Sequence, residues 1–251
     1  MIDIHNHSLF NIDDGSRNLE ESLELLKAAV KQGVSDIILT PHFSLDGTYH
    51  MSKEMLEARV AELSNYASEH NIDINLHLGH ELFIHRDLPE CLYEGKCASL
   101  ANSRYILVEF PFDEYQDTYD YILEDLRAMG YVIIIAHPER YRYVMNDVNF
   151  VLRWLDEGDL LQCNQNILFR KETQKLVKQM LDHHMISFIA SDTHGNKRLS
   201  KMDEAYQTLV SMTSKEVADK LMYYNPLKII NNELIINEAY REVKRRFKFF
   251  K

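Results

Sequence analysis

The feature that most constrains this chain is a repeated alternation of short apolar runs with longer segments of helical periodicity. The apolar runs predict strands, and their nearly continuous apolar character is typical of strands that are buried on both faces. The expected strands are Ile2–Ile4, Asp36–Thr40, Ile74–Leu78, Tyr105–Glu109, Val132–Ala136, Leu160–Cys163 and Ser187–Ala190. Repeated strand and helix units of this kind predict a parallel sheet, either closed into a barrel or left open.

Helices are expected between these strands. They are Leu19–Lys31, Lys53–His70, Thr118–Met129, Asp147–Asp156 and Glu172–His183, with further helices packed outside the sheet from Ser200 to Lys251. Asn18 is a suitable N-cap for the first helix, because Glu21 follows three residues later. The length of 251 residues is close to that of one complete α/β barrel, and no linker or repeat divides the chain. We therefore expect residues 1–251 to form a single domain.

Charge and cysteine content exclude several classes of protein. The net charge of −11 argues against a broad basic face for nucleic acid. Three unevenly spaced cysteines provide neither a disulfide framework nor a CxxC motif. The N-terminus carries no export signal, and the longest strongly apolar run, Tyr131 to Ala136, is too short to span a membrane. A cytoplasmic protein is expected.

Residues that commonly bind metals follow six of the seven expected strands. They are His5 and His7 with a choice of Asp13 or Asp14 after the first strand, then His42, Glu81, Glu109, His137, and Asp192 with His194. The i, i+2 spacing of the first two histidines points both rings to the same side of an extended chain. All of these strand ends open onto one face of a parallel barrel, where active sites of this architecture are built.

Gathered carboxylates and imidazoles need a compensating cation. Repulsion between carboxylates such as Glu81 and Glu109 would raise their pKa values unless divalent metals neutralise them. Mixed imidazole and carboxylate ligands suit zinc, manganese or iron, and no cysteine lies near the set. Each motif alone has a structural explanation, such as a turn or a salt bridge, but their coincidence at strand ends predicts a multinuclear metal site. The role of His80, beside Glu81, stays undecided.

The order of these motifs resembles a known superfamily. IHNH, DDG, TPH, GHE, VEF, AHPERY and ASDTH are similar to the polymerase-and-histidinol-phosphatase (PHP) superfamily. Within it, DIHNH with DDGS, SRYILVEFP, IAHPERY, QCNQ and ASDTH resemble the manganese-dependent protein-tyrosine phosphatases of bacterial capsule and exopolysaccharide operons, over residues 1 to 231. The resemblance implies an α/β fold of PHP type, a distorted TIM-like (β/α)7 barrel with metals at its C-terminal mouth.

The resemblance also implies a ligand set for three metals. The first would be held by His5, His7, Glu81 and Asp192, the second by Glu81, Glu109 and His137, and the third by Asp14, His42 and His194. Asp14 and Glu109 stand where other branches of the superfamily often have histidine. This use of carboxylates fits the preference of manganese for oxygen ligands, so Mn2+ is the expected metal, with iron or zinc as alternatives.

Two basic side chains are expected to bind the phosphoryl group. Arg140 lies three residues after His137, and in this family that arginine is associated with phosphate binding. A salt bridge with Glu139 or Asp147 is the alternative. The second role falls to Arg198 or to Lys197 in the segment GNKR.

The expected activity is hydrolysis of phosphotyrosine in a protein by a metal-activated hydroxide. The resemblance implies that the partner is a bacterial tyrosine kinase that regulates capsule or exopolysaccharide synthesis. The alternatives are a histidinol-phosphate or other small-molecule phosphatase, a metal-dependent nuclease, which the charge argues against, and a regulatory metal-binding module without turnover. A cysteine nucleophile is not expected, because six residues rather than five separate Cys97 from Arg104 and Cys163 from Arg170.

The end of the chain, residues 241–251, forms a basic tail with interleaved phenylalanines at 247, 249 and 250. Such a tail suits peripheral contact with an anionic membrane surface. A solvated basic helix end, or packing on another subunit, is the alternative.

Overall fold

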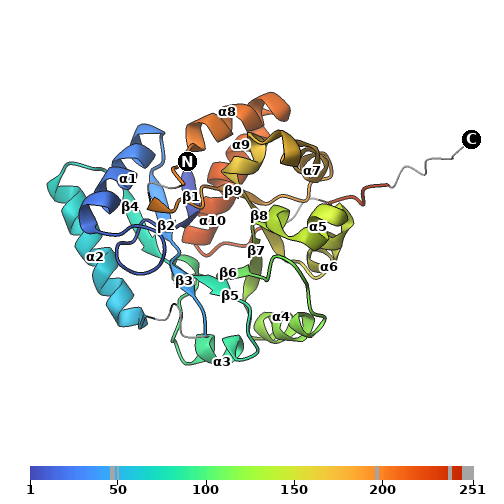
Figure 1. The fold of residues 1–251 in the computed structure, drawn as a ribbon, viewed down its shortest axis with the longest axis horizontal. Helices are drawn as coiled ribbons and strands as arrows, with labels where there is room; N and C mark the ends of the chain where they lie inside the picture. The colour runs from blue at the N-terminus through green and yellow to red at the C-terminus, as the bar shows by residue number, and fades with distance from the viewer. Residues whose placement is uncertain (46–48, 50, 196–197, 237–238, 245–251) are drawn as a thin grey trace, which may run out of the picture.

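The strands of this protein run parallel in two sheets (Figure 1). The computed structural model describes residues 1–45, 49, 51–195, 198–236 and 239–244, without the side chains of 171 and 172. The first sheet has the order β1-β2-β4, and the second has the order β3-β5-β6-β7-β8-β9. The strands are β1 Ile2–Asn6, β2 Asp36–Leu39, β3 His42–Phe43, β4 Asn75–Leu78, β5 Glu81–Phe83, β6 Tyr105–Glu109, β7 Val132–Ala136, β8 Leu160–Asn164 and β9 Phe188–Ala190.

Two of the expected strands are longer than predicted, because each continues after a short break. The path of β2 resumes as β3 beyond Pro41, which has no N–H to donate to a ladder. The path of β4 resumes as β5 beyond Gly79, where an added Cβ would lie 2.7 Å from Leu100 Cδ2. The Glu81 N–H donates to the Pro41 carbonyl at 3.1 Å, so the two paths stay paired across the breaks. The continuations carry His42 and Glu81 inside strands rather than in loops.

The first and last strands of the chain meet at their carboxyl ends. The Asp192 N–H donates to the His5 carbonyl at 2.9 Å, and the His7 N–H donates to the Thr193 carbonyl at 3.0 Å. These bonds bring the two sheets together around a common interior. The prediction of an α/β fold of distorted TIM-like type is confirmed, with the strand paths divided between two sheets.

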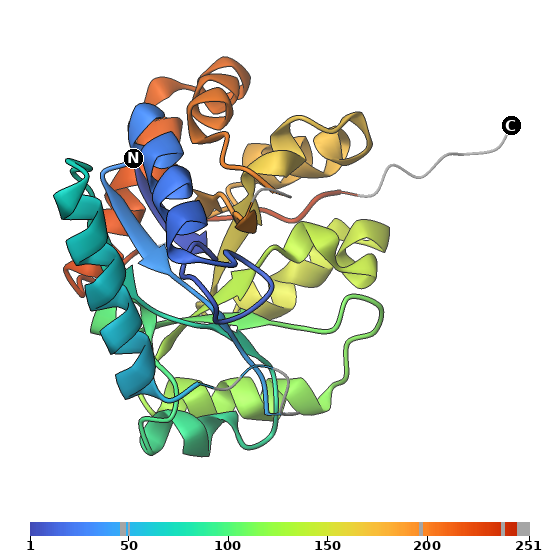
Figure 2. The ribbon, with the colours of Figure 1, turned by 60° about the vertical axis from the view of Figure 1, so that its left-hand side comes forward.

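Helices cover the outside of the sheets, and α1 and α2 lie side by side along one flank (Figure 2). The helices are α1 Leu19–Lys31, α2 Lys53–Glu69, α3 Leu88–Tyr93, α4 Thr118–Ala128, α5 Arg142–Asn146, α6 Leu152–Leu155, α7 Lys171–Asp182, α8 Met202–Met212, α9 Lys215–Asp219, a π-helix Lys220–Tyr224 and α10 Asn225–Ile230. The bounds of α1 match the prediction, and the Asn18 side chain accepts from the Glu21 N–H at 2.8 Å. The short helices α3 and α5 were not predicted.

Buried apolar side chains from the strands fill the interior. One cluster joins Ile4, Leu107, Ile134 and Phe188 to Ile229 of α10. Because α10 contacts the segment that leads into β6, it covers the amino ends of the strands. The carboxyl ends, where the predicted metal ligands lie, are therefore left for the functional site.

Helices were predicted up to the end of the chain, but the last one ends at Ile230. The described residues of 231–244 form no helix. The Arg241 N–H donates to the His183 carbonyl at the end of α7. The Val243 N–H donates to the Asn149 amide oxygen, and the Asn149 amide nitrogen donates to the Val243 carbonyl. Residues 245–251 lie outside the described residues, so the membrane contact predicted for the tail stays a prediction. No helix in the described part of the chain has both the length and the apolar character needed to cross a membrane.

Candidate metal centre

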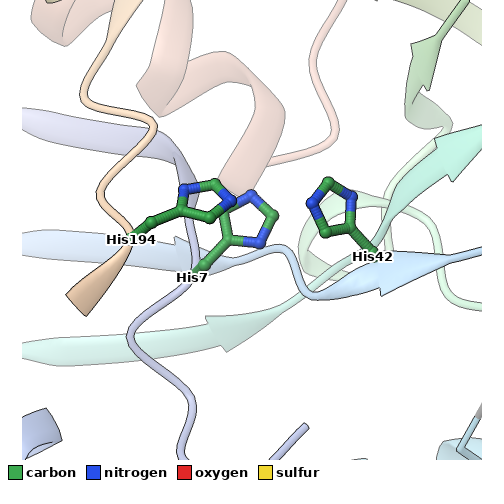
Figure 3. A group of neighbouring side chains, drawn as sticks. All are labelled: His7, His42 and His194. Carbon is green, nitrogen blue, oxygen red and sulfur yellow. The ribbon is translucent and has the colours of Figure 1, made fainter. Parts of the chain in front are cut away.

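The predicted metal ligands converge at the carboxyl ends of the strands, where six of the nine line a cavity of about 320 Å3 and the other three, His5, His7 and His137, are fully buried. They come from β1, β3, β5, β6 and the segments after β1, β7 and β9: His5, His7, Asp14, His42, Glu81, Glu109, His137, Asp192 and His194. Figure 3 shows three of the imidazoles together, with the ring centroids of His7 and His194 only 3.8 Å apart. The structure thus brings together residues that are far apart in the sequence.

The first predicted group is the most deeply buried. Its ligand atoms converge closely, because His5 Nε2 lies 3.1 Å from His7 Nε2 and 3.1 Å from Glu81 Oε2. Asp192 Oδ1 completes the group at 3.6 Å from His5 Nε2. All four side chains are at most 1% exposed.

The hydrogen bonds of this group test whether it fits a cation. When neutral, His5 carries its proton on Nδ1, because that atom faces the Gln162 amide oxygen at 2.8 Å. His7 Nδ1 likewise faces Asp13 Oδ2 at 2.7 Å. The two Nε2 lone pairs therefore point toward each other and toward Glu81 Oε2, a buried oxygen without a hydrogen-bond partner among the described residues. This arrangement of donors fits a divalent metal.

Protons compete with a metal for the same nitrogens. Burial alone would lower the pKa of His5, but the Glu81 and Asp192 carboxylates outweigh it and raise that pKa. Metal binding at such a group releases protons and is favoured as the pH rises.

Glu81 connects the first group to the second. Its Oε1 lies 2.7 Å from His137 Nε2, while its Oε2 faces His5 and His7. Glu109 Oε1 lies 3.5 Å from the same His137 nitrogen. Burial and the nearby Glu81 charge raise the pKa of Glu109 to about 9. Two buried carboxylates in this position also need positive charge between them.

The third group lies nearest to solvent. Asp14 Oδ1 is 3.5 Å from His42 Nε2 and 3.5 Å from His194 Nε2, and the Asp14 side chain is 54% exposed. His42 was predicted for this group alone, yet its Nδ1 lies 3.1 Å from Glu81 Oε2. The structure therefore places His42 between the groups.

Asp13 has a different position from its neighbour Asp14. Its carboxylate accepts from the His42 and Gly15 N–H groups and faces His7 Nδ1. Burial opposes ionisation, but the His7 imidazole lowers the pKa of Asp13 to about 2. A Cβ on Gly15 would lie 2.1 Å from the His7 carbonyl, so only glycine lets the DDG loop fold back on His7.

Of the seven expected strands, only the one that corresponds to β8 is followed by no predicted metal ligand. It supplies two amide side chains that were not predicted as part of the site. Gln162 donates to Asn164 Oδ1 at 2.9 Å, and Asn164 donates to Asp192 Oδ2 at 2.6 Å. Because Gln162 also faces His5, these amides connect two ligands of the first group. Their i, i+2 spacing at the end of a buried strand is the signal that could have identified them.

We expect Gln162→Leu to weaken metal binding by about 10- to 100-fold, because the His5 ring loses the acceptor that orients it. Calorimetric titration of the metal-free protein with Mn2+ would measure the change. Gln165→Leu is the matched control, since Gln165 is also buried but bonds to Leu199 and Lys201. Equal Mn2+ affinity in the Gln162→Leu variant and the wild type would contradict the orienting role.

The two predicted arginines both reach the cavity. His137, with φ of 32°, turns the chain into the short 3-10 helix Pro138–Arg140. Arg140 Nη1 lies 3.5 Å from Asp192 Oδ2, and its guanidinium lies 4.4 Å from the centre of the Phe112 ring. Arg198 Nη1 donates to the same Asp192 oxygen. Lys197, the alternative to Arg198, lies outside the described residues.

His80, left undecided by the sequence, does not line the cavity. Its Nδ1 accepts from the Ala98 N–H at 2.9 Å, and its ring packs edge-on against Phe43. Burial lowers the pKa of His80 to about 4, so a neutral, structural histidine is the simplest interpretation.

Comparison with known proteins identifies relatives along nearly the whole chain. Residues 1–231 match a family described as capsular polysaccharide synthesis, CpsB/CapC. Tyrosine-protein phosphatase YwqE of Bacillus subtilis (strain 168) is 31% identical over 259 aligned residues, covering 100% of both chains.

Solved structures extend this comparison. A structure from work on YwqE of Bacillus subtilis and CpsB of Streptococcus pneumoniae, described as metal-dependent tyrosine phosphatases, matches with a TM-score of 0.92 and 28% identity, covering 98% of this chain and 100% of that one. Histidinol phosphate phosphatase of Lactococcus lactis, solved with zinc, L-histidinol and phosphate, matches with a TM-score of 0.56 and 15% identity, covering 88% of this chain and 94% of that one. The second likeness concerns the fold alone.

Proposed function

Because this chain belongs to the CpsB/CapC family of capsular polysaccharide synthesis, we propose that it hydrolyses phosphotyrosine in a protein substrate of that pathway. It is a metal-dependent protein-tyrosine phosphatase. The observation that carries this conclusion is the convergence of three imidazole nitrogens, from His5, His7 and His42, within 3.2 Å of Glu81 Oε2. Glu81 and His42 line a cavity that two arginines, Arg140 and Arg198, also line.

The nine predicted ligands are proposed to hold three divalent cations in the groups described above. Such cations would polarise the phosphoryl group and lower the pKa of the attacking water. The protein holds Asp192 in place for this role, because Asn164 and Arg198 both donate to its Oδ2. Its Oδ1 is buried and faces two imidazoles, with His194 Nδ1 at 3.1 Å and His5 Nε2 at 3.6 Å. We propose Mn2+ as the native metal, with iron and zinc as alternatives, because four of the nine ligands are carboxylates.

Aromatic side chains favour phosphotyrosine over histidinol phosphate as the substrate. Phe43, Tyr49, Phe83 and Phe112 line the cavity beside the metal ligands. Phe83 and Phe112 are 39% and 38% exposed, so their rings can contact a phenyl group that enters from solvent. We expect kcat/KM on a phosphotyrosyl peptide to exceed that on histidinol phosphate, as steady-state kinetics would measure. The opposite order would favour a small-molecule phosphatase.

The physiological substrate is proposed to be a bacterial tyrosine kinase that regulates capsule or exopolysaccharide synthesis. The family match supports this proposal, because it places the chain in capsular polysaccharide synthesis. Incubating the enzyme with the autophosphorylated kinase, and following phosphotyrosine by immunoblot, would test it directly.

Arg140→Ala is expected to lower kcat/KM by about 10- to 100-fold and to leave the metal content unchanged, because the proposed partner of the guanidinium is the phosphoryl group. Arg140→Lys should restore only part of the loss, since an ammonium cannot reproduce two parallel hydrogen bonds. Arg142→Ala is the matched control, because Arg142 is 71% exposed and pairs with Asp113. A parallel loss of metal in Arg140→Ala would show that the residue acts on the cluster instead.

A further inference from the structure

A second cavity, of about 420 Å3, adjoins the metal cavity. Phe112, Arg140 and Arg198 line both, so they form a shared wall. The remaining lining is mostly polar and includes Asn166 and Arg170, with Met145 and Ile167 as its apolar members. It comes from the 3-10 helix Pro138–Arg140, α5, β8, the segment after β8 and the start of α7. The second cavity is therefore within reach of a polypeptide whose phosphotyrosine occupies the metal cavity.

The second cavity concentrates positive charge in an acidic protein. Three guanidiniums line it, whereas the net charge of the chain is −11. Arg170 forms no ion pair with any side chain that the structure describes. Glu139 is the one carboxylate among the lining residues, and it is buried, with its Oε1 accepting from the Asn164 N–H at 2.8 Å. Arg140 and Arg198 face the buried Asp192 carboxylate, so Arg170 is the guanidinium of this cavity that has no carboxylate partner among the described side chains.

We propose that this second cavity binds an acidic side chain of the substrate polypeptide, close in sequence to the phosphotyrosine. The proposal rests on the proposed function, because it assigns the residues that flank the reacting group. An extended polypeptide advances about 3.3 Å per residue and the two cavities share a wall, so the acidic side chain is proposed to lie one or two residues from the phosphotyrosine. Guanidinium and amide donors match a carboxylate, whereas a lysine or arginine in the substrate would be repelled.

Arg170 is the residue that distinguishes the second cavity from the first. It does not line the metal cavity, whereas Arg140 and Arg198 do. Its contribution can therefore be separated from phosphate binding by comparing peptides that differ only in a flanking side chain.

The test uses phosphotyrosyl peptides with glutamate or glutamine at each of the two positions before and after the phosphotyrosine. The measured quantity is the ratio of kcat/KM for the glutamate peptide to that for the glutamine peptide. For the wild-type enzyme loaded with Mn2+ we expect a ratio of roughly three to ten at one or more positions, and a fall with added salt. Arg170→Gln should bring this ratio close to one, and Arg170→Lys should give an intermediate value.

Lys178→Gln is the matched control. It removes one positive charge from α7, the helix that Arg170 directly precedes, but Lys178 pairs with Asp182 at the other end of that helix and lines neither cavity. It should keep the wild-type ratio. A wild-type ratio of one at every position would overturn the proposal, and so would a preference for glutamate that Arg170→Gln leaves unchanged. Failure of the proposed function would look different, because the glutamine peptides would then not be hydrolysed either.

Discussion

Glu81→Ala is expected to lower kcat/KM by about a thousandfold, the largest effect of any single substitution proposed here. Glu81 directs one carboxylate oxygen to His137 and the other to His5, His7 and His42. Its loss would remove negative charge from between the proposed cations. A loss of about 3–4 kcal/mol of stabilisation at the transition state corresponds to two or three powers of ten in rate. Steady-state kinetics on a phosphotyrosyl peptide would measure the loss.

Metal analysis separates this explanation from a general loss of structure. The Glu81→Ala variant should contain fewer metal ions per chain than the wild type, while circular dichroism shows an intact fold. Glu81→Gln keeps the size of the side chain but not its charge, and we expect it to be nearly as inactive. Near-normal activity with a full complement of metal would refute the bridging position of Glu81.

Chelation is expected to abolish phosphotyrosine hydrolysis, and added Mn2+ should restore it. Replacing Cys91, Cys97 and Cys163 together with serine should leave most of the activity. None of the three lines the metal cavity, and all three are buried. Burial raises the pKa of Cys97 to about 12 and also raises the pKa values of Cys91 and Cys163, so their thiols are poor nucleophiles at neutral pH.

The effects of chelation and of cysteine replacement must be compared to decide between the two mechanisms. Serine in a buried position can reduce stability, so each variant should be assayed well below its melting temperature, with cysteine-to-alanine variants as a second set. An enzyme that survives chelation but loses activity when Cys97 or Cys163 is replaced would contradict the metal mechanism. A chelation-sensitive enzyme that ignores phosphotyrosyl peptides would contradict only the substrate.

The strand-end positions of the proposed ligands could be predicted because parallel strands bring their carboxyl ends to one face. This regularity explains why His137 and Asp192, 55 positions apart in the sequence, were expected near each other. It did not reveal the breaks at Pro41 and Gly79. The positions of these breaks depend on which neighbouring strand each segment pairs with, and the residues of the segment itself do not specify that strand.

The roles of the residues that surround the proposed ligands were not predictable from the sequence in the same way. Asp13 and Asp14 are adjacent acids, and only the fold of the loop at Gly15 separates a partner of His7 from a residue that faces His42 and His194. Gln162 and Asn164 carry no charge, so they gave no signal comparable to that of a histidine. Arg170 was noted only for its spacing from a cysteine, because its cavity is formed by segments that meet in three dimensions.

The contact between β1 and the segment after β9 determines when the site can form during translation. His5 and His7 are among the first residues to be made, whereas Asp192 and His194 come much later. At about 5–20 residues per second, translation puts roughly 10–40 s between the two pairs. Throughout that interval a nascent chain lacks the complete set of donors. Premature termination anywhere before Asp192 would therefore yield a fragment that cannot assemble the centre, however well its earlier strands have paired.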